Sequence, residues 1–397
     1  MTAISPRLSL HPAVAAQAAR RARATGPRGT TTYRMLFGVL AVLNLLGLVM
    51  VLSASSVVGL HREGSSWFYF SRQVLGVVGG MVLFVVAVTV DYRVWRRFAV
   101  WGYLAAVALL AAVLVPGVGV DVNGSARWVD LGPMQLQPSE FAKLGVLLLV
   151  AHILARRQAW VLHADKVVVP AAVWTAIVAI LLMLQPNLGT TLVVGAIVMS
   201  MLFAVGVPGR HIGLLALVAT AGATFATLFT PYRRARFFAF LDPWSDPGST
   251  GYQNVQAQVS LGSGGWLGVG LGEGTQKWGF LPEAHTDFIF AIIGEELGLL
   301  GALLVVVLFA ALGVFGLRTA LDAPDTYGRI VATGITTWFC VQGFVNIGAV
   351  IGILPITGIP LPFVSFGSSA MLANMAAAGI LCNICRSSRS AATRAEP

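Results

Sequence analysis

Residues 286–316 read TDFIFAIIGEELGLLGALLVVVLFAALGVFG, an apolar run with three acids in its first half. A membrane-spanning helix needs about 20 mostly apolar residues, so this run is long enough to cross a bilayer. A carboxylate in hydrocarbon is costly unless it finds a partner or serves a function. The run therefore predicts a membrane helix in which Asp287, Glu295 and Glu296 each require an explanation.

The rest of the chain has the same character. Of its 397 residues, 57% are hydrophobic and 11% are charged, whereas soluble domains carry about 25% charged residues. No single globular core could bury so much apolar surface. The sequence predicts an all-α polytopic membrane protein with about ten spans, near residues 35–58, 73–90, 98–116, 141–155, 167–185, 189–206, 212–230, 286–316, 330–353 and 363–385.

Ten spans put both termini on one side of the membrane. If that side is cytoplasmic, most of the 26 lysines and arginines lie on it, as the positive-inside rule expects. The net charge of +10 is then a topology signal, and no nucleic-acid partner is expected. The predicted organisation is a disordered basic cytoplasmic tail over 1–32, a membrane domain over 33–386 and a cytoplasmic tail over 387–397.

Three connections on the opposite, extracytoplasmic side are unusual. They cover residues 117–138, residues 231–285 between the seventh and eighth spans, and residues 355–362 in a proline- and glycine-rich stretch. Long loops in compact proteins are usually functional. The glycine-rich run 261–274 lacks the strand and the Gly-Lys-Ser/Thr of a nucleotide loop, so a close-packed or surface-hugging segment is expected there. The sequence thus predicts one polar site at the outer face.

The acids at the start of residues 286–316 allow two interpretations. If a helix starts near Pro282, Glu283 and Asp287 lie four apart on one face, with His285 roughly opposite. Asp287 could then be a general base with a raised pKa, or a residue that stabilises the helix N-terminus. The same face continues with small residues, which let a neighbouring helix approach closely: Ala291, Gly294 and Gly298.

Glu295 and Glu296 lie deeper in the run. The favoured interpretation is structural: buried acids that hold a polar or basic group of another helix. A proton relay is the alternative. Asp287, with Glu283 or His285, could also hold a divalent cation, Mg²⁺ or Mn²⁺, together with substrate phosphates.

Basic residues crowd the same outer loops. Such a group suits a phosphate or diphosphate ligand, while snorkelling toward lipid headgroups is the alternative for each member. The candidates are Arg127, Lys143, Arg233, Arg236 and Lys277. Around Lys143, the sequence PSEFAK predicts a helix start with Ser139 as its cap and Glu140 in the first turn.

The motifs together resemble the SEDS family (shape, elongation, division and sporulation), which comprises FtsW, RodA and SpoVE proteins. The matching segments follow the family order: NGSARW (123–128), QPSEFAKL (137–144), QPNLGT (185–190), RRARFFAFLDPWSDPGSTGYQNVQ (233–256), GSGGWLGVGLGEGTQKWGFLPEAHTDFIFAIIGEELG (262–298) and PITGIPLPFVSFGSSAM (355–371). The resemblance covers about residues 35–385, and the segment around Asp287 is its most specific part.

This resemblance implies an inverting peptidoglycan glycosyltransferase that polymerises lipid II at the outer face of the bacterial cytoplasmic membrane and releases undecaprenyl diphosphate. It makes Asp287 the essential aspartate. It also implies substrate-binding roles, toward the diphosphate or the sugars of lipid II, for Arg127, Lys143, Arg233, Arg236, Gln256, Lys277, Glu283, His285, Ser365 and Ser369.

The resemblance further implies partners: a class B penicillin-binding protein that acts as transpeptidase, and other membrane proteins of the divisome. The long basic tail and VLSASS (51–56) favour a division-type member at the septum over an elongation-type (RodA) polymerase. A lipid II flippase is the rival function. Two departures stand out: Asn187 replaces the acid of QPDLG, and Phe366 replaces a tyrosine in the usual SYGGSS.

Overall fold

The computed structural model describes residues 28–122, 125–130, 132 and 135–394. Ten of the helices in this part of the chain are long and apolar enough to cross a membrane, as the sequence predicts. They are α2 (Arg28–Glu63), α3 (Phe68–Thr89), α4 (Tyr92–Val113), α5 (Pro138–Arg156), α6 (Ala164–Leu184), α7 (Leu188–Val205), α8 (Gly209–Leu228), α11 (Ile289–Leu321), α12 (Thr326–Val350) and α13 (Ser368–Arg394).

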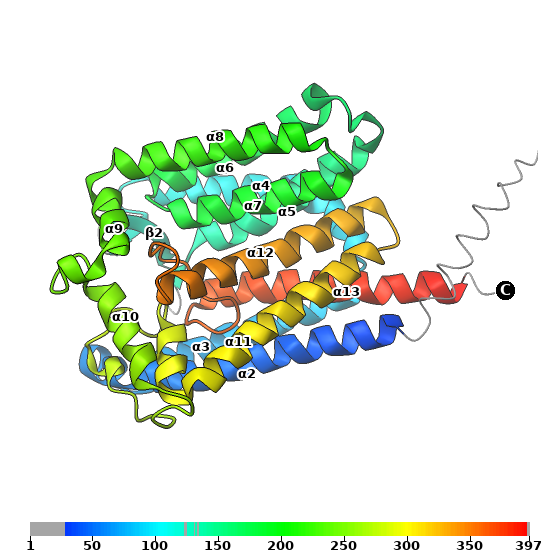
Figure 1. Ribbon diagram of the computed structural model, residues 1–397. Helices are drawn as coiled ribbons and strands as arrows, with labels where there is room; N and C mark the ends of the chain where they lie inside the picture. Colours follow the sequence, from blue (N-terminus) through cyan, green and yellow to red (C-terminus); the bar gives the residue numbers. More distant parts are fainter. Residues whose placement is uncertain (1–27, 123–124, 131, 133–134, 395–397) are drawn as a thin grey trace, which may run out of the picture.

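The helices form one bundle whose two ends differ (Figure 1). The additional helices α9 (Pro231–Leu241) and α10 (Tyr252–Ser263) lie at one end, together with strand β2 (Ser125–Asp130). The start of α2 and the end of α13 both lie at the other end. Because the number of spans is even, these two helix ends lie on the same side of the bundle, and the assignment of that side to the cytoplasm stays a prediction.

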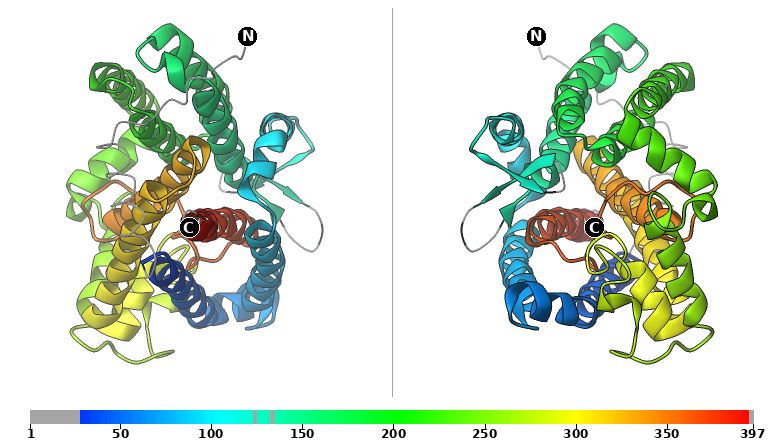
Figure 2. Two further views of the ribbon diagram at one scale, coloured as in Figure 1. Left: turned by 90° about the vertical axis from the view of Figure 1, so that its right-hand side faces the viewer. Right: turned by 90° about the vertical axis from the view of Figure 1, so that its left-hand side faces the viewer.

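The interior of the bundle is built around α13, which packs against α3, α2, α5 and α12 (Figure 2). In the most apolar 18-residue stretch of α13, 83% of the residues are buried, whereas no residue of the corresponding stretch of α8 is buried. Helix α8 lies at an edge of the bundle and offers its apolar side chains to lipid. The protein core is therefore on the α13 side of the molecule.

The connection 117–138, predicted as a loop, contains a small sheet. Strands β1 (Gly119–Val122), β2 (Ser125–Asp130) and β3 (Gln135–Leu136) are antiparallel in the order β1-β2-β3. The register is irregular between Val120 and Asp121, as at a β-bulge. The sheet leads directly into α5 and carries Arg127 on its middle strand.

Helix α11 starts later than predicted, and the expected helical face of Glu283 and Asp287 is wrong. Residues 282–288 form consecutive turns, and the helix begins at Ile289. The amides of Thr286 and Phe288 both donate to the Glu283 carbonyl, at 3.2 and 3.3 Å, which closes tight turns in place of regular helical bonds. Glu283 itself has φ +56°, a conformation that does not continue an α-helix.

Helix α11 is also interrupted at Gly298, where φ is +67° and ψ is −166°. The glycine-rich segment fills the break: the Val269 amide donates to the Glu295 carbonyl at 3.0 Å, and the Leu299 amide donates to the Gly265 carbonyl at 2.9 Å. A Cβ atom on Gly298 would collide with the backbone of this segment. The predicted close-packed segment is therefore present, and it satisfies the peptide groups that the broken helix leaves free.

Close approach at Gly294 agrees with the prediction for the small face of α11. The partner is α10, whose Leu261 lies against Gly294 so closely that an added Cβ would overlap its side chain. The Ser260 hydroxyl donates to the Ala291 carbonyl at 3.1 Å. Helix α10 thus fixes the first turns of α11, directly after Asp287.

Candidate functional site

The turn 282–288 is held in place by the segment between α12 and α13. The Ser365 hydroxyl donates to the Thr286 carbonyl at 2.6 Å, and the Phe366 amide donates to the His285 carbonyl at 2.9 Å. From α12, the Asn346 side-chain amide donates to the carbonyl oxygens of Asp287 and Ile359, both at 2.8 Å. These bonds fix the main chain around Asp287 and do not involve its side chain.

The Asp287 carboxylate is half-buried, and it makes no ion pair within 4 Å of a cation in the described part of the chain. It faces Gly358, where a Cβ atom would lie 3.5 Å from the carboxylate oxygen. Gly358 has φ +69°. A carboxylate oxygen that is packed beside backbone but not neutralised is available to accept a proton or a hydrogen bond from a ligand.

The pKa of Asp287 is raised from 3.8 to about 6, and burial is the main cause. The negative charge of Glu283 adds to the rise, while the positive charges of Arg236 and Arg127 oppose it. Burial destabilises the charged form of an acid, and nearby cations stabilise it. The balance gives a carboxylate that is ionised at neutral pH and takes up a proton just below it.

Arg127 and Arg236 are the cations that the structure brings to Asp287. Arg127 lies on β2 and donates to two backbone carbonyls of the QPN segment, that of Gln185 at 2.9 Å and that of Pro186 at 2.8 Å. Burial lowers the pKa of its guanidinium, and the charges of Asp287, Arg236 and Arg233 also reach it. Arg127 from the connection 117–138 and Arg236 from the connection 231–285 thus both act on the charge of Asp287.

Helix α9 supplies Arg236 and Arg233. The Arg236 guanidinium lies over the Tyr232 ring, 4.7 Å from its centroid, and Arg233 donates to the Ala226 carbonyl at 3.4 Å. Neither arginine forms an ion pair with a carboxylate among the residues described. We call Arg127, Arg236 and Asp287 the open cluster, because their charges are close but not consumed by one another.

Lys143 lies in the first turns of α5, as expected, but its ammonium is enclosed by protein groups, and its contact with a substrate stays a prediction. Its side chain is fully buried in α5, and its ammonium lies 2.9 Å from Glu140 and 2.7 Å from the Gln342 side-chain oxygen. The Trp338 ring lies 4.7 Å from the ammonium. Helix α5 does begin at Pro138 with Glu140 in its first turn, but Ser139 is not its cap. Because Pro138 occupies the first turn, the N-cap position falls on Gln137.

Lys277 is likewise enclosed, although it too was a candidate ligand for phosphate. Its ammonium lies 2.9 Å from Glu296 and 3.2 Å from the Ser53 hydroxyl of α2, and it also donates to the Gly272 carbonyl. Only 3% of Lys277 is exposed. We call Lys143–Glu140 and Lys277–Glu296 the two closed pairs.

Glu295 and Glu296 have the geometry that a structural role requires. Glu296 binds Lys277 and the Ser53 hydroxyl, the latter at 2.7 Å. Glu295 accepts from the backbone amide of Thr275 at 2.7 Å and from the Ser260 hydroxyl at 3.2 Å. Both acids therefore bind α11 to the connection 231–285, through Lys277 and Thr275. They also contact other helices: Glu296 binds Ser53 of α2, and Glu295 binds Ser260 of α10.

His285 lies between aromatic rings and not opposite Asp287 on a helix. Its ring centroid is 4.6 Å from that of Tyr69 and 5.5 Å from that of Phe366. Burial lowers its pKa to about 4, so the imidazole is neutral at physiological pH. Glu283 is half-buried and accepts from the Thr286 hydroxyl at 3.0 Å. Phe366, one of the departures from the family pattern, thus packs directly against His285.

Ser365 and Ser369 are occupied by backbone groups. Ser365 bridges the Leu361 amide, at 2.8 Å, and the Thr286 carbonyl. Ser369 donates to the Gln135 carbonyl at 2.8 Å and accepts from the Gln137 amide at 3.0 Å. Gln256 is half-buried on α10. The two serines therefore position the site's segments, and their contact with a substrate stays a prediction, as it does for Gln256.

Asn187 has a clear structural part. It is the N-cap of α7, where its side-chain oxygen accepts from the Thr190 amide at 3.3 Å. Aspartate and asparagine cap helices about equally well. The departure from QPDLG is therefore compatible with the same fold, and the QPN backbone still receives Arg127.

Two residues of the site were missed by sequence reasoning. Asn346 holds the Asp287 carbonyl, and Tyr232 supports Arg236. A signal existed for the first, since a polar amide inside an apolar span is rare and usually has a partner. Tyr232 gave no comparable signal, because an aromatic residue at the membrane surface is ordinary.

The described residues do not form a protein-built metal centre. They contain no group of three or more histidine, cysteine, aspartate or glutamate side chains that could surround an ion. Among the described residues, Asp287 and Glu283 are the acids whose charges act at the open cluster, and the His285 ring is packed between aromatics. The divalent cation stays a prediction, and no step proposed below depends on it.

Comparisons with known proteins agree on one family. The sequence model of the FtsW/RodA/SpoVE family, described as cell cycle protein, matches residues 33–390. The chain is 40% identical to the probable peptidoglycan glycosyltransferase FtsW of Geobacter metallireducens, over 89% of this chain and 94% of that protein. It is 39% identical to the stage V sporulation protein E of Bacillus subtilis, over 90% and 98%.

Solved structures lead to the same conclusion. A chain of a peptidoglycan synthase complex, studied for the coordination of polymerization and crosslinking, matches with a TM-score of 0.72 and 31% identity, over 89% of this chain and 97% of that one. The rod shape determining protein RodA of Thermus thermophilus matches with a TM-score of 0.64 and 29% identity, over 88% and 95%. The protein is a member of the FtsW/RodA/SpoVE family.

Proposed function

We propose that this protein is a peptidoglycan glycosyltransferase of the division type, which polymerises lipid II at the outer face of the cytoplasmic membrane. The observation that carries the proposal is the open cluster: a half-buried carboxylate with a pKa of about 6, beside two arginines, at the end of a membrane bundle. Relatives at about 40% identity that bear this enzyme name support the substrate class.

In the proposed reaction, Asp287 is the general base. It accepts the proton of a sugar hydroxyl on the acceptor as that oxygen attacks the anomeric carbon of the donor. The new C–O bond forms while the bond from the anomeric carbon to the diphosphate oxygen breaks, and undecaprenyl diphosphate leaves with the electron pair. Attack from the face opposite the leaving group inverts the anomeric configuration. A base with a pKa near the working pH is effective in such a step.

Arg127 and Arg236 would bind the diphosphate of the donor and stabilise the charge that grows on it as it leaves. Arginine suits this role because its planar guanidinium can donate two parallel hydrogen bonds to a phosphate. Arg233, on the same helix as Arg236, adds positive charge nearby. The two closed pairs would support the reaction indirectly, by holding α5 and α11 in place.

The test uses the full chain in liposomes with lipid II and a class B penicillin-binding protein. Asp287→Asn keeps the shape of the side chain and removes the base, so glycan polymerisation should fall by at least about a hundredfold. Asp246→Asn, at an exposed acid of the same outer connection, is the matched control and should polymerise normally. Near wild-type polymerisation by a folded Asp287→Asn protein would show that Asp287 is not the base.

The same liposomes separate the enzyme from a lipid II flippase. With polymerisation blocked by the substitution, labelled lipid II is placed on one leaflet and its appearance on the other is measured. An enzyme without transport activity leaves the label where it was. Movement of the label that requires the protein, without any glycan product from the wild type, would favour the flippase.

We further infer that the chain works at the division septum in a complex with its transpeptidase and other divisome membrane proteins. A solved relative belongs to a complex that coordinates polymerization and crosslinking, which supports a synthase partner. Copurification of the tagged full chain from the membranes of its own cells, followed by identification of any penicillin-binding protein, tests this. Copurification of an elongation-specific synthase alone would assign the RodA-type role instead.

A further inference from the structure

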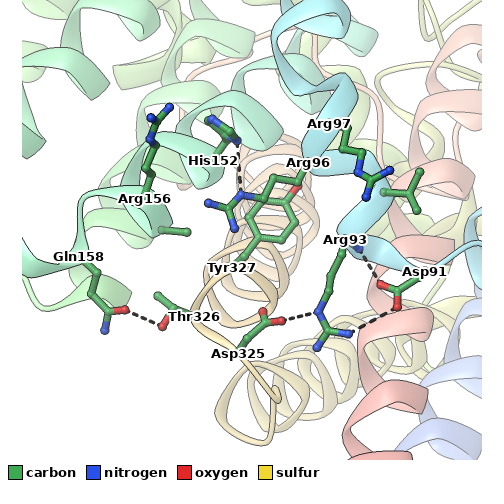
Figure 3. A pocket seen from close by; sticks show the side chains of 12 residues that line it. Asp91, Arg93, Arg96, Arg97, His152, Arg156, Gln158, Asp325, Thr326 and Tyr327 are labelled. Carbon is green, nitrogen blue, oxygen red and sulfur yellow. Dashed lines mark hydrogen bonds and ion pairs between the residues drawn. The ribbon is translucent and has the colours of Figure 1, made fainter.

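A cavity of about 870 Å³, whose lining side chains Figure 3 shows, lies at the end of the bundle where α12 begins, whereas Asp287 precedes α11 at the other end. The start of α4, the end of α5 and the start of α12 surround it, and its lining includes four arginines, one histidine and two aspartates. The positive-inside rule assigns this end to the cytoplasm. No step of the proposed glycosyl transfer uses it.

The positive charge of this cavity is only partly balanced. Arg93 forms ion pairs with both aspartates of the lining, at 3.5 Å from Asp91 and 2.8 Å from Asp325. Arg96, Arg97 and Arg156 form no ion pair with a carboxylate anywhere in residues 28–122, 125–130, 132 and 135–394. Cations gathered around a concave surface without counter-charges favour an anionic ligand.

Two further features point to a bound group. Tyr327 lines the cavity with only 3% of its surface exposed, and its hydroxyl has no hydrogen-bond partner among the described atoms. Buried hydroxyls normally have a partner. The Arg96 guanidinium lies across the Tyr327 ring, 5.6 Å from its centroid, and its Nε donates to His152 Nδ1 at 3.4 Å. A buried hydroxyl and a pre-oriented guanidinium are donors suited to phosphate oxygens.

The position of the cavity favours a lipid as the source of the anion. A smaller cavity of about 320 Å³, lined by Arg156, Arg157 and Trp160, adjoins it. Trp160 and the nearby Leu162 are 46% and 70% exposed. Exposed tryptophan at the end of a span marks the headgroup level of the membrane. The first 27 residues of the chain contain arginines and no acid, so they do not supply the anion.

We propose that this basic cavity binds a phosphate group, carried by an anionic phospholipid of the inner leaflet, with Arg96, Arg156 and the Tyr327 hydroxyl as donors. Basic pockets between helices at the cytoplasmic side are suited to such headgroups. The acyl chains would lie along the exposed apolar surface beside Trp160. The inference is independent of the chemistry at Asp287.

The test is direct binding to the purified full chain in detergent micelles. The probes are short-chain phosphatidylglycerol, short-chain phosphatidylcholine and inorganic phosphate, and thermophoresis of the labelled protein is the readout. The variant Arg96→Gln/Arg156→Gln removes two donors. Arg210→Gln/Arg318→Gln removes two exposed arginines from the same end of the bundle, outside the cavity, and is the matched control.

Saturable binding of phosphatidylglycerol is expected, weaker by at least about tenfold in the cavity variant and within about twofold of wild type in the control. Phosphatidylcholine should not saturate. Inorganic phosphate that binds as tightly, and is lost in the same variant, would support the phosphate site and assign it to a soluble ligand. Equal weakening in both double variants, or no saturable binding of either phosphate probe, would overturn the proposal.

Tyr327→Phe guards against misfolding as an explanation. The substitution keeps the buried ring and removes only a hydroxyl that has no partner among the described atoms. Its thermal midpoint should match wild type, while phosphatidylglycerol binding weakens several-fold. Unchanged binding would remove the hydroxyl from the site. A decaglutamate peptide that binds through the two arginines when neither phosphate probe does would replace the lipid with an acidic protein segment.

Discussion

The open cluster and the two closed pairs contain the same kinds of side chain and behave differently. Asp287, Arg127 and Arg236 influence one another through charge but form no ion pair with each other. The Asp287 oxygens, and the donors of the two arginines that bind no backbone carbonyl, therefore remain for a ligand. Lys143 and Lys277 lie within 2.9 Å of Glu140 and Glu296 and are almost completely buried. A cation near a functional loop is thus a ligand candidate only if the fold has not already neutralised it.

Helix α12 contacts both a closed pair, through Gln342, and the turn that carries Asp287, through Asn346. Gln342 accepts from Lys143 and donates to the Pro360 carbonyl at 2.8 Å, and Asn346, one turn further, donates to Asp287 and Ile359. The residues are four apart and therefore neighbours on the helix surface. Two side-chain amides thereby fix the segment after α12 between the Lys143–Glu140 pair and the turn 282–288.

The largest expected effect comes from breaking a closed pair. Lys143→Met leaves the Glu140 carboxylate buried without its cation, which should lower the free energy of unfolding by about 3–5 kcal/mol. Thermal unfolding of the detergent-solubilised protein, followed by size exclusion, measures this. Lys143→Met/Glu140→Gln removes the stranded charge and should recover most of the loss. A Lys143→Met protein as stable as wild type would mean that the pair is not structural.

The next effect comes from the open cluster. Arg236→Gln should leave the thermal midpoint unchanged and lower kcat/KM for lipid II about 10- to 100-fold, because a hydrogen bond to a charged group contributes about 1.5–3 kcal/mol. Arg234→Gln, at an exposed arginine of the same helix, is the control for general loss of charge. If both variants lose the same activity, Arg236 acts only through the overall charge of α9.

A smaller effect is expected at Ser365, which bridges the Leu361 amide and the Thr286 carbonyl beside Asp287. Ser365→Ala should reduce stability by about 1–2 kcal/mol while KM for lipid II stays constant. The same preparations used for Lys143→Met and the same polymerisation assay give both quantities. A higher KM without any loss of stability would return Ser365 to the substrate site, as the sequence resemblance implies.

The smallest effect concerns pH. Because the pKa of Asp287 is raised from 3.8 to about 6, the base is protonated at pH 5 and ionised at pH 7, and kcat/KM should rise with pH through a limb near 6. Glu283→Gln removes a negative charge that raises this pKa, so the limb should move to lower pH. Arg236→Gln removes a positive charge that lowers it, so the limb should move to higher pH. Shifts in the same direction would contradict the electrostatic assignment.

Much of the fold was accessible from the sequence because its signals are local. Each apolar run of a span lies within one window, and ten such runs predicted ten spanning helices. The glycine-rich segment was expected to pack closely, and it does, against the break at Gly298. The start of α11 at Ile289 and the sheet at 119–136 were not foreseen, because turn and strand geometry there depends on distant partners such as Ser365 and α5.

By itself, the sequence determined the class of protein and predicted a candidate site at one end of the bundle with Asp287 as its candidate base, since apolar length, charge bias and the motif around Asp287 are local features of the chain. Only the tertiary structure decided which cations remain available. Glu140 lies three residues from Lys143 in the same helix, but the pair is enclosed with Gln342, which is 199 positions from Lys143. Lys277 pairs with Glu296, 19 positions away, and contacts Ser53, 224 positions away. Pairing in a low-dielectric interior depends on three-dimensional proximity, so it becomes visible only once the helices are packed.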